Sequence, residues 1–147
     1  MTAPRTRRKA PALDGILETA LYVEDLDIAR AFYADTMAFA EILSDARMAA
    51  FAVGDDRVLL LFKRGASAVE AHLPGGIIPP HDGSGPIHIA FAVSARSLAA
   101  WERHLAAAGI EIESTVDWPD KRGRSIYFRD PDGHLLELAP RRLWKHM

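Results

Sequence analysis

The sequence predicts an α+β domain made of two β-α-β-β-β modules. Two observations lead to this class. The order of one strand, one helix and three strands can be assigned twice, once over residues 15–64 and again over residues 87–140. The first strands of the two copies also align, because Glu18 lies 70 residues before His88 and the same alternation of side chains follows each. Self-similarity at a fixed spacing predicts a repeated structural unit.

The elements of the first module follow from alternation and from turn residues. Residues 16–23 alternate apolar and polar side chains, the pattern of a strand with one face in a core. Asp25 or Asp27 can cap the next helix, in which apolar residues recur at helical spacing to about residue 35. Three further strands are expected over residues 41–43, 48–53 and 57–62, the last two joined by a turn at Gly54-Asp-Asp56.

The second module repeats this order. Residues 87–93 alternate like the first strand, and a helix is expected from Ala95 to about Ala108. Strands are expected over residues 110–113 and 125–128, followed by the turn Asp130-Pro-Asp-Gly133 and a last strand over residues 134–138. The Gly- and Pro-rich connection between the modules, residues 65–86, is long enough to be either disordered or a lid over an active site.

Length and composition indicate one domain, residues 15–140, after a disordered basic arm, residues 1–14, and before a short tail, residues 141–147. The chain has 147 residues, a net charge of −2 and no cysteine, which excludes disulfide and thiol chemistry. This charge argues against a nucleic-acid partner, and no apolar run approaches the roughly 20 residues of a membrane span. We therefore expect a cytoplasmic protein whose partner is a small molecule.

Three potential metal ligands stand at related positions. Glu18 and His88 open the first strands of the two modules, and Glu137 lies in the last strand of the second. Each shares its strand face with small residues such as Ala20 and Ala90, which leave room for a cavity. Two carboxylates and an imidazole suit a first-row divalent ion with positions left open for water or substrate. Each residue alone is more simply explained as a hydrogen-bonded or solvated side chain, but together they predict a metal site.

Other residues are candidates for contacts with a substrate. His81 lies in the Gly- and Pro-rich connection and can either close over the site or belong to an exposed loop. Arg124, at the end of a basic segment, can border a pocket for an acidic substrate or form an ordinary solvated charge run. His134 is expected on the strand face opposite to Glu137 and is not counted as a ligand.

The chain resembles the vicinal oxygen chelate superfamily in three segments: Glu18-Thr-Ala-Leu-Tyr-Val-Glu-Asp-Leu26 with Ala31-Phe-Tyr33, Gly85-Pro-Ile-His-Ile-Ala90, and Tyr127-Phe-Arg-Asp-Pro-Asp-Gly-His-Leu-Leu-Glu-Leu138. The superfamily includes glyoxalase I, bleomycin resistance proteins, fosfomycin resistance enzymes, methylmalonyl-CoA epimerase and extradiol dioxygenases. The resemblance implies that the paired modules form a U-shaped mixed sheet around a divalent metal such as nickel, zinc, manganese or iron. It places the ligands at Glu18, His88 and Glu137. It also implies a homodimer, and some members share the site between subunits.

Three positions bear on the choice among members. Leu60 stands where glyoxalase I has a further ligand, and a leucine cannot bind metal. Glu18 replaces the first histidine of dioxygenases and fosfomycin enzymes, which makes the site more anionic. Tyr127 stands ten residues before Glu137, as does the active-site tyrosine of extradiol dioxygenases, and is either a substrate contact or an ordinary strand residue.

We therefore expect a metal-dependent enzyme with lyase or isomerase chemistry of the glyoxalase kind. The metal would polarise a carbonyl or stabilise an oxyanion, with Glu18 or Glu137 as general base. Three alternatives stay open. They are an extradiol-type dioxygenase, a non-catalytic protein that sequesters a drug or metabolite as bleomycin resistance proteins do, and a structural or regulatory module with a vestigial triad.

Overall fold

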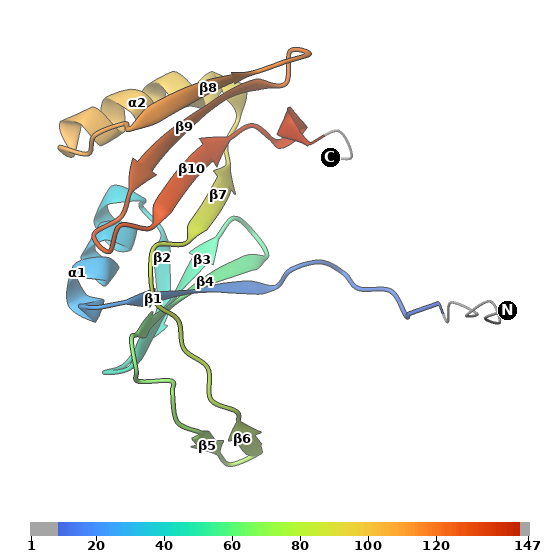
Figure 1. Cartoon of the computed structure of the whole chain (residues 1–147), viewed down its shortest axis with the longest axis vertical. Helices are drawn as coiled ribbons and strands as arrows, with labels where there is room; N and C mark the ends of the chain where they lie inside the picture. Colours follow the sequence, from blue (N-terminus) through green and yellow to red (C-terminus); the bar gives the residue numbers. More distant parts are fainter. Residues whose placement is uncertain (1–8, 145–147) are drawn as a thin grey trace, which may run out of the picture.

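The computed structural model describes residues 9–144, in which two four-stranded sheets have the same topology (Figure 1). The strand orders are β1-β4-β3-β2 and β7-β10-β9-β8. In each sheet the first strand of the module pairs in parallel with the last, and the remaining pairs are antiparallel. This confirms the predicted α+β class with two β-α-β-β-β modules.

The bounds of the elements are close to those expected from the sequence. The first module contains β1 (Glu18–Val23), α1 (Leu26–Ala31), a π-helical turn (Phe32–Thr36), β2 (Ala40–Ser44), β3 (Met48–Val53) and β4 (Arg57–Lys63). The second contains β7 (His88–Ala92), a 3-10 turn (Ala95–Ser97), α2 (Leu98–Ala107), β8 (Ser114–Trp118), β9 (Gly123–Arg129) and β10 (Leu135–Ala139). Asp25 caps α1, since its carboxylate accepts a hydrogen bond from the Ile28 N–H at 3.0 Å.

One expectation about the elements is wrong. Residues 110–113 form no strand; Ile110 and Ile112 instead pack, half-buried, against the core as an extended connection, and the strand is β8. Of the two alternatives for the connection 65–86, disorder does not apply to the short hairpin that it contains, β5 (Ala71–Leu73) and β6 (Gly76–Ile78). A 3-10 turn at Arg141–Leu143 also lies within the predicted tail.

The strand registers show that the two modules are equivalent residue by residue. Ala20 of β1 stands opposite Leu60 of β4, and Ala90 of β7 stands opposite Glu137 of β10. The same backbone position therefore carries an apolar side chain in one module and a carboxylate in the other.

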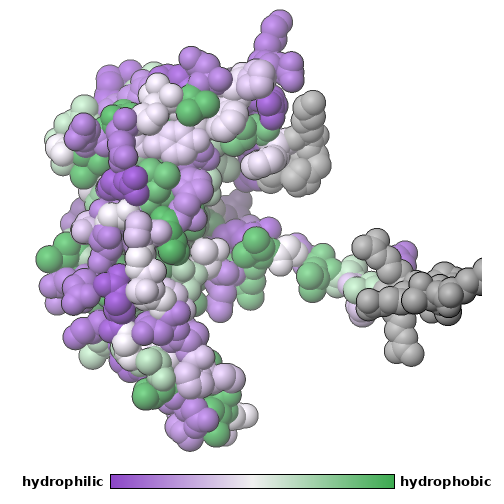
Figure 2. All heavy atoms as spheres, in the orientation of Figure 1, coloured by the Kyte–Doolittle hydropathy of each residue, from purple (hydrophilic) through white to green (hydrophobic). Residues whose placement is uncertain are grey.

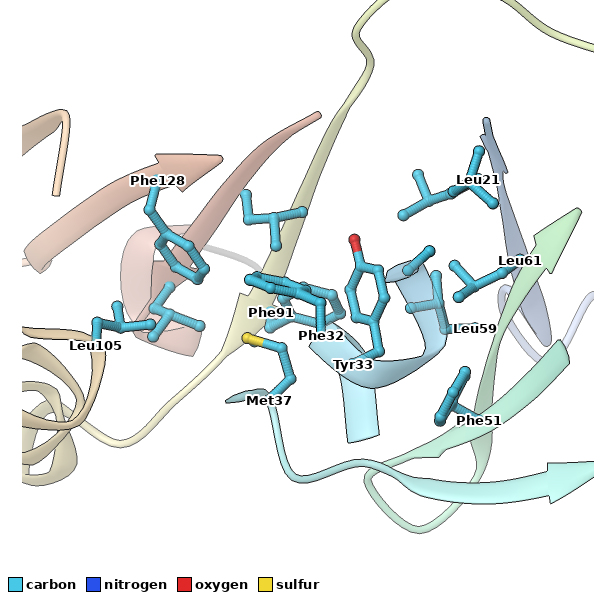
Figure 3. Packing of buried hydrophobic residues seen from close by; sticks show 14 of the residues in the cluster. Leu21, Phe32, Tyr33, Met37, Phe51, Leu59, Leu61, Phe91, Leu105 and Phe128 are labelled. Atoms are coloured by element: carbon cyan, nitrogen blue, oxygen red, sulfur yellow. The ribbon is translucent and has the colours of Figure 1, made fainter. Parts of the chain in front are cut away.

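One hydrophobic core joins the helix-facing sides of the two sheets. Figure 3 shows Phe32, Tyr33 and Met37 lying between side chains of the first sheet and side chains of the second. The opposite face of each sheet does not pack against this core. These two faces are called the inner faces below. Because side chains alternate along a strand, the positions next to each core residue project onto an inner face.

The turn between β9 and β10 ties the modules together. Asp130 is buried, and its carboxylate accepts hydrogen bonds from the Tyr33 hydroxyl at 2.7 Å and from the backbone N–H of Asp132 and His134. His134 is 1% exposed; its Nε2 donates to the Tyr22 carbonyl, and its Nδ1 accepts from the Ile87 N–H. The motif thus connects β1 and the helical segment of the first module to β7 and β10 of the second.

An extended segment precedes β1. Residues 9–17 have no regular secondary structure and leave the body of the molecule (Figure 1), and hydrophobic residues lie at the surface along this segment (Figure 2). Among them, Leu13, Ile16 and Leu17 are exposed. The predicted disordered arm, residues 1–14, overlaps this segment only in part, because residues 1–8 lie outside the described residues. Among the described helices, none has both the length and the apolar character needed to cross a membrane.

Candidate functional site

The inner face of the second sheet brings three of the predicted site residues together. Glu137 of β10 stands opposite Tyr127 of β9 and one strand away from β7, which begins at His88. The rings of His88 and Tyr127 are 6.3 Å apart between centroids. An imidazole, a carboxylate and a phenol therefore share one surface whose remaining neighbours on β7, Ala90 and Ala92, are small.

His88 is held in the orientation of a typical metal ligand. Its Nδ1 lies 2.9 Å from the Leu135 carbonyl oxygen. Because a carbonyl oxygen can only accept, Nδ1 carries the proton and Nε2 keeps a free lone pair. Histidines that bind metals usually donate their other N–H to a backbone carbonyl or a carboxylate in this way. The ring itself is exposed.

Glu137 is a buried carboxylate with no cation beside it. Its side chain is 5% exposed, and no ion pair of the described residues includes it. Burial, together with the hydrogen bond and the charge of Glu137, raises the pKa of Tyr127 to about 12, so the phenol is protonated at neutral pH and can donate. A buried carboxylate is costly unless a cation or hydrogen-bond donors are supplied.

Glu18 lies on the inner face of the first sheet, where it lines a cavity of about 690 Å³. The floor of the cavity is formed by residues of the sheet, and its other walls come from the connection between the modules. Leu60 is part of this lining, so the position equivalent to Glu137 adds no ligand here. The polar residues that line the cavity are Glu18, Asp45, Arg47, Ser67 and His81.

His81 fastens the connection to the first sheet. Its Nδ1 lies 2.7 Å from the Tyr22 hydroxyl, and its ring packs edge-on against Phe62 at 4.6 Å between centroids. The backbone N–H of His81 also donates to the Ser67 carbonyl. These contacts hold the connection against the first sheet, where it closes one side of the cavity.

Gly83 is required for this closure. A Cβ at residue 83 would lie 2.5 Å from the Tyr22 ring, which His81 already holds in place. We expect Gly83→Ala to push the connection off the sheet and to raise amide exchange or protease cleavage within residues 65–86. Gly75→Ala is the matched control, because a Cβ there meets nothing within 4 Å. Equal protection in both variants would show that the contact with Tyr22 does not hold the connection.

Within one chain, the three predicted metal ligands do not come together, and Arg124 does not lie beside them. Glu18 lies on one inner face and the pair His88 and Glu137 on the other, and within residues 9–144 no three acidic, histidine or cysteine residues are placed to hold an ion together. Arg124 lies on the helix side of the second sheet, where it pairs with Glu102 of α2, and that hydrogen bond raises its pKa.

The sequence did not reveal the role of the Asp130 to His134 turn. The turn was expected from its residue types, but the inter-module bonds of Asp130 and His134 depend on partners more than 90 residues away along the chain. One signal was available, since a histidine and two aspartates in a tight turn offer more hydrogen-bonding groups than the turn itself needs.

The fold and the inner-face residues define a protein of the paired β-α-β-β-β class with an acid-and-imidazole surface. A family model described as the Glyoxalase/Bleomycin resistance protein/Dioxygenase superfamily matches residues 15–138. The chain belongs to this superfamily. The predicted recognition of the vicinal oxygen chelate family is confirmed.

Several known proteins are similar to the chain over most of its length. The metallothiol transferase FosB of Shouchella clausii (strain KSM-K16) is 29% identical over 127 residues, which is 86% of this chain and 80% of that protein. The structure of a lactoylglutathione lyase from Agrobacterium tumefaciens has a TM-score of 0.81 at 33% identity and covers 91% of this chain and 98% of its own.

A third similar structure is a mutant of the fosfomycin resistance protein FosX from Listeria monocytogenes, complexed with Mn(II) and 1S,2S-dihydroxypropylphosphonic acid. It has a TM-score of 0.65 at 23% identity and covers 92% of this chain and all of its own. At that identity the likeness extends to the fold alone.

Proposed function

We propose that the protein is a divalent-metal-dependent enzyme that acts on a small molecule offering two neighbouring oxygens to the ion, with lyase or isomerase chemistry. The observation that carries this proposal is the pair on the second inner face. His88 presents a free Nε2, and Glu137 is a buried carboxylate without a cation. A divalent ion bound by both would satisfy each of them.

The donor set fits a first-row ion. One imidazole nitrogen with carboxylate oxygens suits nickel, zinc, manganese or iron, and leaves positions for substrate oxygens. When bound, such an ion would act as a Lewis acid on the substrate. The name of one relative agrees with this, since it is a metallothiol transferase.

In this proposal the protein is a homodimer, and Glu18 of one subunit completes the metal site formed by His88 and Glu137 of the other. Within one chain it lines the cavity of the first module, away from His88 and Glu137. A second copy that placed its first inner face against the second inner face of this chain would bring the three residues together. Exposed Ile16, Leu17, Ile77 and Ile78 offer apolar surface for such contact. A cytoplasmic location is also part of the proposal.

In this proposal, side chains of the protein would stabilise the developing charge, take up the substrate proton and contact the substrate. Tyr127 stays protonated up to about pH 12, so its hydroxyl can donate a hydrogen bond to a developing negative charge on a substrate oxygen. Glu18 or Glu137 would take the substrate proton as general base. His81 lines the cavity beside Glu18 and would contact the substrate from the connection between the modules.

The proposal is tested by metal content. Protein purified without a polyhistidine tag, incubated with manganese, nickel, zinc or iron and desalted, is expected to keep about one ion per chain. His88→Ala/Glu137→Ala should keep none, as measured by elemental mass spectrometry. A wild-type protein that takes up none of these ions would overturn the enzyme proposal.

One observation favours a second candidate, a non-catalytic binding protein. The cavity of the first module is formed within one chain and is large enough for a drug-sized molecule. Tight binding of a small molecule that a chelator does not change, without turnover, would favour this reading.

A further inference from the structure

We propose that the cavity of the first module binds the apolar body of the substrate, so that the part of the ligand held there is an uncharged aromatic or aliphatic group with one hydrogen-bonding atom. This inference rests on the proposed function for the position of the reacting end, beside Glu18. The identity of the body, however, follows from the cavity itself, and it can be tested without metal.

The walls of the cavity are mainly apolar on both sides. Ala50, Leu60 and Phe62 project from β3 and β4 as its floor. Val69, Leu73 and Ile78 face it from the connection between the modules and are themselves largely exposed. A volume of about 690 Å³ is that of a site for a drug-sized ligand. Filling it would remove exposed apolar surface from water on both walls.

The charged groups in the lining do not suit a small anion. Arg47 carries the only permanent positive charge among the described lining residues, and its guanidinium already donates to the Ala66 carbonyl. Asp45 and Glu18 bring two negative charges to the same cavity. A phosphonate or dicarboxylate would therefore meet net repulsion here unless a metal were bound.

One polar atom in the lining has no partner of its own. The Ser67 Oγ is buried, with the residue 3% exposed, and no described residue forms a hydrogen bond with it. A buried hydroxyl without a partner is destabilising. Ser67 lines the cavity, and a ligand with one oxygen or nitrogen beside it would satisfy the hydroxyl once the side chain turned toward the cavity. The ligand body is therefore apolar with a single hydrogen-bonding group.

The first test uses protein stripped of metal with EDTA and the uncharged fluorescent probe N-phenyl-1-naphthylamine. Its fluorescence is expected to saturate at about one probe per chain. Leu60→Asn, which puts an amide on the floor, should weaken binding about tenfold or more. The matched control is Ile112→Asn, at a half-buried residue that packs against the hydrophobic core and does not line the cavity. Absence of saturable binding, or equal weakening in both variants, would overturn the inference.

The second test concerns Ser67. 1-Naphthol and 1-methylnaphthalene both compete with the probe, and Ser67→Ala should weaken only the naphthol, by about three- to tenfold. An equal effect on both competitors would refute the role of the hydroxyl.

A third test separates this inference from the proposed function. In manganese-loaded protein, 2-hydroxy acids from lactate to 2-hydroxyoctanoate should bind about three- to fourfold more tightly for each added methylene. If the probe binds the stripped protein but manganese does not strengthen binding of the acids, the proposed function fails and the cavity assignment stands. If the acids require manganese but show no dependence on chain length, the cavity assignment fails alone.

Discussion

Glu137→Gln is expected to abolish the stabilisation of the protein by divalent metal. At a metal concentration about 100 times the dissociation constant, the wild-type protein should gain about 2.7 kcal/mol, or roughly 5–10 °C in Tm. The glutamine has the same size as the glutamate, but it has no charge. We expect its affinity for the ion to fall at least about 100-fold, so that differential scanning calorimetry shows little or no shift.

The same variant should behave in the opposite way without metal. Because Glu137 is buried with no cation beside it, its replacement by a neutral isostere removes the cost of burying a charge. The metal-free variant is thus expected to be as stable as the metal-free wild type or more stable. Glu111→Gln, at an exposed carboxylate, is the control and should keep the metal-induced shift. A full shift in Glu137→Gln would exclude Glu137 as a ligand.

Asp130→Ala is expected to be among the most destabilising single substitutions in the chain. It removes one carboxylate that accepts three hydrogen bonds, one of them from the Tyr33 hydroxyl of the other module. Burial raises the pKa of Tyr33, and the adjacent Asp130 adds to this, so the hydroxyl remains a donor that would lose its partner. We expect a loss of about 2–4 kcal/mol in the free energy of unfolding, measured by urea denaturation.

The repeat supplies a matched control for this substitution. Asp55 lies in the corresponding turn of the first module and is exposed, so Asp55→Ala should change stability by less than about 0.5 kcal/mol. Tyr33→Phe removes only the donor and should cost about 1 kcal/mol. If Asp130→Ala were no worse than Asp55→Ala, the turn would not be what joins the modules.

The repeat made most of the fold predictable from the sequence. Alternation located β1, β3 and β4 to within two residues, and the second module could be checked against the first. The failure at residues 110–113 has a physical cause. Their alternation is that of a strand, but the hairpin partner of β9 is the next segment, β8. The turn that joins β8 to β9 contains Asp120 and Lys121, which adopt positive φ values of 58° and 55°. Glycine usually occupies such positions, and here it follows only afterwards, as Gly123 at the start of β9, so the turn residues themselves gave little signal.

The candidate site was only partly predictable. Alternation predicted that His88 and Glu137 share the small-residue face, and the registers agree with this and add Tyr127 opposite Glu137. The helix-side position of Arg124 follows from the same alternation, since it shares its face with Ile126 and Phe128. By contrast, a strand pattern does not fix how two sheets are placed relative to each other. That Glu18 lies apart from His88 and Glu137 could therefore not be derived from the sequence.

The proposal that one metal site is built from two chains is tested most directly with mixed dimers. Glu18→Ala and His88→Ala chains, carrying different non-histidine affinity tags, are co-expressed and the heterodimer is isolated through both tags. In a shared arrangement the heterodimer has one site with both substitutions and one site with neither. It should therefore bind about one ion per dimer by elemental mass spectrometry, while each variant homodimer binds none. A heterodimer as empty as its parents, beside a fully loaded wild-type dimer, would contradict the shared site.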